Sequence, residues 1–237
     1  METSLHRQLK SIYAADVTDT EVRMGRYRID AVRDGELIEI QHGSLAAIRS
    51  KISALLPDSR VRVVKPIVAR KLLIKRAGKG KKIVDRRLSP KRCTVLDLFS
   101  ELVYFCRVFP HPNLTLEVPL VEMEEWRYPG HGRRRRHRSN DFQVEDQKLT
   151  SVGDVHELRE AEDLLDLLPQ PLPAEFGTAE LAAHCSISAH FARQVAYCLR
   201  ETGAVTQIRK RGNALIYRCS HSREKTTKTS RASRRAG

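Results

Sequence analysis

The chain has 237 residues, 41% of them hydrophobic, which is enough for one large or two small folded domains and argues against wholesale disorder. Lys and Arg outnumber Asp and Glu by 43 to 29, and the net charge of +14 indicates a polyanionic partner, with nucleic acid ahead of an acidic membrane surface. No apolar run reaches the roughly 18 residues of a membrane span, and no apolar leader stands at the start. Five widely spaced cysteines without C-x-x-C argue against a disulfide framework or a zinc site. These features predict a protein of the reducing cytoplasm with no membrane partner.

The positive charge is concentrated in one internal segment. Residues 61–92 hold 13 basic side chains and a single acidic one, Asp85. Clustered charge of this kind is typical of phosphate binding, although a solvated surface is the plain alternative. We therefore predict that Lys79, Lys81 and Lys82 contact the DNA backbone.

The first 75 residues alternate between helical and extended patterns. Asp34-Gly35 is a strong signal for a two-residue hairpin turn. In chain order, the spacing of apolar residues predicts a helix over 2–14, extended structure over 21–33 with an interruption at Gly25, a returning strand over 36–42, a helix over 45–56 and strands over 60–75 broken at Pro66.

The remainder divides into a completing region and a second module. The pattern predicts a helix over 94–109, extended structure over 114–128, and a loop whose Arg133–Arg138 run either clamps a nucleic-acid backbone or is simply mobile. A helix is expected over 154–168. The resulting organisation is an α/β domain over 1–150, a second module over 151–219 and a disordered basic tail over 220–237.

The hairpin around Asp34-Gly35 places two acidic residues opposite each other. A two-residue turn pairs Asp30 with Glu39, with Cβ atoms about 4.5–5.5 Å apart. Alternation assigns one face to the core and the other, with both carboxylates, to solvent; the core set is Ile29, Ala31, Ile38 and Ile40, and the wet set includes Arg28 and Gln41. Opposed like charges destabilise a sheet unless one carboxylate is protonated or a cation lies between them. A hard cation such as Mg²⁺, or possibly Mn²⁺, suits carboxylate oxygens.

Asp30 followed after the turn by Glu39-Ile40-Gln41, within a helix–three strands–helix–strand order, resembles the PD-(D/E)xK, or restriction-endonuclease-like, nuclease superfamily. The resemblance implies an αβββαβ core with a mixed sheet. It implies that Asp30, Glu39 and the main-chain carbonyl of Ile40 hold Mg²⁺. It also implies a helix acidic residue, Glu2, for which Glu21 competes.

Gln41 departs from that family pattern because Lys is usual at its position. Glutamine neither carries a positive charge nor accepts a proton as a base, so the metal or another group must activate the attacking water. His6 and His42 are candidates for that task, and Arg28 is a candidate source of the missing charge.

Residues 155–219 resemble a winged helix-turn-helix domain, with helices over 179–184 and 189–202 followed by a hairpin over 205–218. The resemblance implies that the second helix enters the major groove and that the hairpin contacts phosphate. The residues so placed are Ser188, His190, Arg193 and Gln194 on the helix and Arg209, Lys210 and Arg211 on the hairpin. The alternative is a module that docks another protein.

Together these features predict a metal-dependent DNA endonuclease that acts on duplex or branched DNA, with a homodimer possible because double-strand cutting needs two sites. The main alternative is a catalytically silent nuclease fold that serves as a DNA-binding regulator or recruitment factor. RNA processing is less favoured because aromatic residues, which stack on single-stranded bases, make up only 5%.

Overall fold

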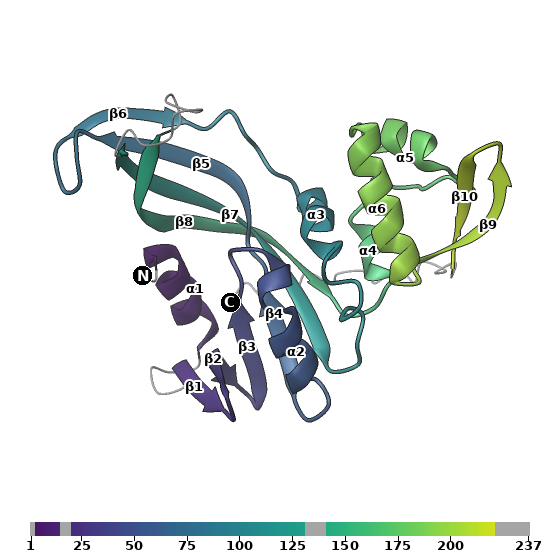
Figure 1. Cartoon of the computed structure of the whole chain (residues 1–237), viewed down its shortest axis with the longest axis horizontal. Coiled ribbons are helices and arrows are strands. Elements are labelled where there is room, and N and C mark those ends of the chain that lie inside the picture. The colour runs from purple at the N-terminus through teal and green to yellow at the C-terminus, as the bar shows by residue number, and fades with distance from the viewer. Residues whose placement is uncertain (1–2, 15–19, 131–140, 221–237) are drawn as a thin grey trace, which may run out of the picture.

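The computed structural model describes residues 3–14, 20–130 and 141–220 (Figure 1). Glu2, the Arg133–Arg138 run and residues 221–237 of the expected tail lie outside these ranges. Within them, no helix is both long and apolar enough to cross a membrane.

The chain forms an α/β fold around a large mixed sheet, which confirms the predicted class. Five strands follow each other across the sheet, and those from the third to the fifth are mutually parallel. They are β1 (Thr20–Met24), β2 (Tyr27–Arg33), β3 (Glu36–Ile40), β4 (Arg60–Val64) and β7 (Leu114–Pro129).

β7 is the longest central strand and carries the rest of the sheet. Its first part pairs with β4 and its second part, in parallel, with β5 (Ile67–Arg76), because Pro66 lacks an N–H and separates those two strands. β6 (Ile83–Leu88) runs antiparallel to β5, and β8 (Phe142–Leu158) runs antiparallel to β7. The β5–β6 hairpin and the outer halves of β7 and β8 thus form an arm beyond the first four strands (Figure 1).

The predicted hairpin between β2 and β3 is confirmed. Asp34 and Gly35 both adopt positive φ, at 51° and 72°, as a tight two-residue turn between right-twisted strands requires. The observed pairs Arg33–Glu36, Val32–Leu37 and Ala31–Ile38 are those that the turn predicts.

Helices cover both faces of the first four strands. On one face, α1 (Ser4–Tyr13) packs Leu5 and Leu9 against a small cluster that includes Ala31, Ile38 and Ile40. On the other, α2 (Arg49–Leu55), which follows a short 3-10 turn (Leu45–Ala47), and α3 (Leu98–Leu102), which follows a second one (Val95–Asp97), join a larger cluster.

The expectation of one wet hairpin face is therefore wrong, because α2 and α3 cover it. Leu37 is buried there, and Glu39 is only 7% exposed. Ile29 also packs into this larger cluster and not with Ala31 against α1.

The helix predicted over residues 154–168 is wrong as well. β8 continues to Leu158 and so crosses the expected boundary at residue 150, and only α4 (Asp163–Asp166) is helical. The apolar residues of this segment repeat at helical spacing, which misleads the prediction. In the structure they lie on the end of a strand, on a turn and on a short helix, and all of these bury them. The buried residues are Leu158, Ala161, Leu164, Leu165, Leu167 and Leu168.

The C-terminal elements follow the predicted order. They are α5 (Thr178–His184), α6 (Ala189–Glu201) and the antiparallel pair β9 (Val205–Arg211) and β10 (Ala214–Cys219). Ser188 caps α6 as predicted, since its hydroxyl accepts the Phe191 N–H at 3.2 Å.

This C-terminal part is not separated from the sheet by a solvated linker. Its buried residues belong to the same apolar cluster as those of α2 and α3. α6 lies directly against α3 (Figure 1), where the Cys198 thiol donates to the Phe99 carbonyl at 3.5 Å. The two parts therefore share one core.

Candidate functional site

The two strands of the hairpin diverge at the predicted acidic pair. Ladder pairing between β2 and β3 ends at Ala31–Ile38, one position before Asp30 and Glu39. In the gap, Asp30 Oδ2 accepts the main-chain N–H of Ile40 at 2.8 Å. A carboxylate thus replaces a ladder partner at the point where the sheet opens.

α1 supplies two further contacts to Asp30. His6 Nε2 lies 3.1 Å from Asp30 Oδ1, and the buried Lys10 Nζ lies 3.5 Å from the same oxygen. Lys10 also pairs with Glu21, which in turn pairs with Arg28. Glu21, the alternative acidic candidate, therefore reaches this site through Lys10.

Glu39 is contacted from α2. Lys51 Nζ lies 2.5 Å from Glu39 Oε2 and also donates to the Arg28 carbonyl. Both side chains are largely buried, with exposed fractions of 19% for Lys51 and 9% for Glu39. A lysine from the following helix therefore faces the second carboxylate.

The protein shifts the two carboxyl pKa values in opposite directions. Burial on its own would raise the pKa of Asp30, but the hydrogen bonds from His6 and Ile40 outweigh it and hold that pKa below its usual value. Burial raises the pKa of Glu39, and the charge of Asp30 raises it further against the opposing effect of Lys51. Asp30 is contacted from α1 on one face of the sheet and Glu39 from α2 on the other, so the predicted direct pairing of the two carboxylates is not observed.

Gln41 is directed elsewhere. Its side-chain amide donates to the Ser44 carbonyl at 2.7 Å, and its main-chain N–H donates to Val64. It thereby closes the turn after β3, while Lys51 occupies the neighbourhood of Glu39. His42 lies beyond this turn, where burial and then the charges of Lys65 and Lys71 lower its pKa.

Sequence reasoning overlooked Lys51 and Lys10, and it named His6 only for activating water. Lys51 precedes Ile52, one of the buried residues on the stripe that seats α2 on the sheet. A basic residue beside that stripe, on the helix that follows the Glu39 strand, was the available signal.

The residues present fit a Mg²⁺ ion that keeps most of its waters. The described residues contain no cluster of three or more His, Cys, Asp or Glu side chains suited to a metal. Mg²⁺ is commonly held by one or two carboxylates plus phosphate and water. Burial, followed by the charge of Asp30, raises the pKa of Glu39, and a cation beside the carboxylate would oppose both effects.

The predicted DNA contacts lie in two regions. Lys79, Lys81 and Lys82 are exposed in the turn that joins β5 and β6. On α6, three of the predicted reading residues line a pocket of about 210 Å³ together with Tyr197 and Val103 of the α3 region; these are His190, Arg193 and Gln194.

The arginines of the β9–β10 hairpin have acidic partners. Arg209 pairs with Glu175, and Arg211 pairs with Glu180. Lys210 is exposed between them at the same hairpin. Part of the predicted phosphate-binding charge is therefore already compensated within the module.

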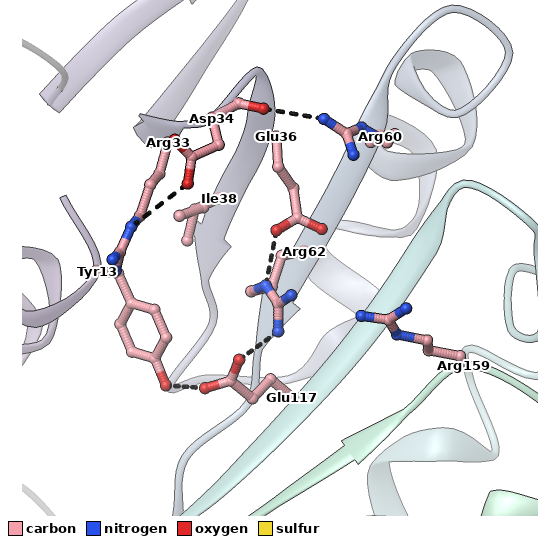
Figure 2. A pocket seen from close by; sticks show the side chains of 9 residues that line it. All are labelled: Tyr13, Arg33, Asp34, Glu36, Ile38, Arg60, Arg62, Glu117 and Arg159. Carbon is pink, nitrogen blue, oxygen red and sulfur yellow. Dashed lines mark hydrogen bonds and ion pairs between the residues drawn. The ribbon is translucent and has the colours of Figure 1, made fainter. Parts of the chain in front are cut away.

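A separate cavity of about 330 Å³ lies near the β2–β3 turn (Figure 2). Arg62 on its floor contacts Glu36 at 2.8 Å, Glu117 at 2.5 Å and Glu157 at 2.8 Å. Tyr13 donates to Glu117, and burial followed by this contact raises the tyrosine pKa. Since the floor is charge-compensated, we interpret it as a structural network that joins α1, β3, β4, β7 and β8.

No curated protein and no solved structure matches the chain. One family model does, described as a domain of unknown function (DUF8091), and it matches residues 3–159. That range runs from the start of α1 to the end of β8, which is more than half of the chain and includes Asp30, Glu39 and Lys51. The chain therefore belongs to the DUF8091 family.

Proposed function

We propose that this protein is a metal-dependent DNA endonuclease whose sheet domain is restriction-endonuclease-like. The single observation that carries the proposal is the Asp30–Glu39 pair at the divergence of β2 and β3, flanked by Lys51. The surrounding order of helix, three antiparallel strands, helix and parallel strand supports it. Asp30 is half-buried and Glu39 is buried, and metal-dependent phosphodiester hydrolysis commonly uses two carboxylates at such a position.

Each residue has a distinct task in this proposal. Asp30 and Glu39, with the Ile40 carbonyl, would hold Mg²⁺ or Mn²⁺, which supplies Lewis-acid stabilisation and a polarised water. Lys51 takes the role that Lys has in the family motif and that Gln41 cannot perform. Its ammonium stabilises negative charge beside Glu39, while His6 and Lys10 keep Asp30 ionised and oriented.

DNA is positioned by basic surfaces outside this site. The β5–β6 turn offers Lys79, Lys81 and Lys82 to phosphates. The C-terminal part would act as a winged helix, with α6 and the β9–β10 hairpin on the duplex. His190, Arg193 and Gln194 line a pocket together with Val103, which follows α3, so DNA that these residues contact would approach α6 beside the end of α3.

The test is cleavage of linear, supercoiled and branched DNA by the full chain with Mg²⁺ or Mn²⁺. Asp30→Asn, Glu39→Gln and Lys51→Met should each reduce cleavage at least 100-fold, because each removes a group that contacts the reacting centre. Asp34→Asn, a carboxylate change at the exposed turn of the same hairpin, should leave cleavage unchanged. Full activity in Asp30→Asn would refute the assignment.

The silent-fold alternative has one specific observation in its favour. Asp30 and Glu39 each already have a cationic partner from the chain, so no metal is needed to compensate their charge. On that reading, DNA binding would be tight and salt-sensitive, and no metal would support cleavage. A metal-dependent rise in the stability of the wild type that Glu39→Gln abolishes would exclude it.

A further inference from the structure

A third cavity, of about 320 Å³, opens where β3 and β4 end. Ligands of open α/β sheets characteristically bind at the carboxyl ends of parallel strands. Here β3 and β4 are parallel, and the cavity is lined by His42, just beyond β3, and by residues 65–68 at the β4–β5 break. Its volume falls at the lower end of the usual range for small-molecule pockets, about 300–1,000 Å³.

Three lysines line this cavity: Lys65, Lys71 and Lys91. Lys65 is buried, with 4% of the residue exposed, and its ammonium donates to the carbonyls of His42 at 3.2 Å and Gly43 at 2.5 Å. An ammonium has three N–H donors, so two carbonyls leave one donor for a ligand. The nearest carboxylate oxygen, Glu101 Oε1, is 4.0 Å away.

The acidic residues of the cavity are committed to the backbone. Glu101 Oε2 accepts the Leu45 N–H at 3.0 Å, and Asp97 Oδ2 accepts the Thr94 N–H at 2.8 Å. Lys71 is bonded by Glu125 at 2.7 Å. Lys65 thus has a carboxylate partner only in Glu101, at 4.0 Å, and Lys91 has no ion pair with the other described residues.

We propose that this cavity binds a phosphate monoester through Lys65, Lys71 and Lys91. A monoester carries a charge of about −1.5 to −2 at neutral pH, which suits an unpaired Lys91 ammonium and a Lys65 ammonium whose carboxylate partner is 4.0 Å away better than a singly charged diester does. Burial lowers the pKa of Lys65, and an anion in contact with its ammonium would oppose that cost. The site goes beyond the proposed cleavage and does not depend on Asp30 or Glu39.

Two sources of this chemistry exist, a free nucleotide and the phosphorylated end of a nucleic-acid strand. The cavity begins at His42, three residues after Glu39 along the chain. A strand end held there would lie beside the proposed cleavage site.

The test begins with inorganic phosphate as the probe, titrated calorimetrically into the full chain without divalent metal and at constant ionic strength. Saturable binding is expected, and Lys71→Gln and Lys91→Gln should each weaken it roughly tenfold, as loss of one charge-assisted contact does. Lys148→Gln, an exposed position of β8 outside the cavity, is the matched control and should not change it. Lys65→Met should have the largest effect, but the other two variants decide the result if it fails to fold.

A second set of titrations distinguishes the sources. Tighter binding of a 5′- or 3′-phosphorylated oligonucleotide than of its hydroxyl-ended counterpart supports a strand end, and binding of a deoxynucleoside monophosphate alone supports a free nucleotide. Asp30→Asn should lose cleavage yet retain phosphate binding, so the two proposals fail independently. The phosphate site is overturned if binding is not saturable, or if Lys148→Gln weakens it as much as Lys91→Gln.

Discussion

At the scale of single residues, the fold shifts the pKa values of Asp30 and Glu39 in opposite directions. Asp30 is bonded in its charged form, so its carboxylate stabilises the folded state above the ordinary Asp pKa, and that contribution is lost as pH falls through its lowered pKa. Glu39 has a raised pKa, so its protonated carboxyl group contributes to the stability of the folded state. This contribution is fully present below the ordinary Glu pKa and is lost as pH rises through the raised value.

Stability against pH should therefore move in opposite directions for the two variants. Asp30→Asn should cost roughly 1–3 kcal/mol at pH 7, as loss of a buried charged hydrogen-bonding group does, and less at pH 3.5. Glu39→Gln should gain stability relative to the wild type as pH rises from 4 to 7. Urea unfolding across this range measures both, and parallel pH profiles for the two variants would contradict the assigned environments.

The two-residue turn defines the register locally as far as Ala31–Ile38, but the ladder ends before Asp30 and Glu39, so their predicted pairing on one face is not observed. Lys51 is different, since its contact with Glu39 depends on where α2 packs, and no local pattern gives that position. The residue at the expected position, Gln41, instead bonds Ser44 three residues on. The sequence therefore predicts the geometry of the turn, but it does not predict which side chain of a helix packed on the sheet contacts Glu39.

At the scale of elements, Arg62 joins strands that the sequence does not show to be adjacent. It is a half-buried guanidinium in β4 that contacts the carboxylates of Glu36 in β3 and Glu117 in β7 (Figure 2) and that of Glu157 in β8. Arg62→Met should destabilise the fold by about 3–5 kcal/mol, because it leaves three carboxylates without their shared cation. Arg60→Met, two residues earlier and exposed, should change stability by less than about 0.5 kcal/mol. Equal effects of the two in urea unfolding would show that the network is dispensable.

The β5–β6 turn carries the prediction on DNA affinity. Replacing Lys79, Lys81 and Lys82 by Gln should weaken binding across all sequences and reduce the slope of log affinity against log salt by about 2 to 3. Titrations of labelled duplex at several salt concentrations measure that slope. The triple variant Arg23→Gln, Arg26→Gln and Arg33→Gln, in and beside β1 and β2, removes the same charge from another surface and should leave the slope nearly unchanged. An unaltered slope in the lysine variant would show that this turn does not touch phosphate.

The elements that the sequence missed are those with misleading periodicity. β6 is exposed along its whole length and rich in arginine, so it has none of the alternation that marks a half-buried strand. The second half of β8 exposes Val152 and Val155, while the apolar residues beyond it repeat at helical spacing. That segment is a strand because it pairs with the long strand β7. The two strands are far apart in the sequence, so a local sequence pattern does not predict their pairing.

At the scale of the whole molecule, the shared core predicts that the two parts unfold together. Leu199 on α6 is fully buried in the cluster that also includes α3 residues, whereas the only tryptophan, Trp126, lies on β7. Leu199→Ala should cost about 2–5 kcal/mol and should shift the fluorescence midpoint of Trp126 as well as the circular dichroism midpoint.

The exposed His190, on the same helix, is the matched site for a control, and His190→Ala should shift neither midpoint. A Trp126 midpoint that stays in place while the helical signal is lost earlier would show two independently folding domains.

The outer strand of the arm has a consequence for handling the protein. Among the described residues, β6 pairs only with β5, so its other side presents backbone groups that no described strand pairs with, beside exposed Ile83, Val84 and Leu88. Strands of other copies can pair with such an exposed edge strand. The positive charges of Arg86 and Arg87 oppose this pairing, because those of two copies repel each other. High ionic strength screens this repulsion. Concentrated samples in strong salt are therefore expected to polymerise side by side, and dilute conditions at modest salt should keep the copies apart.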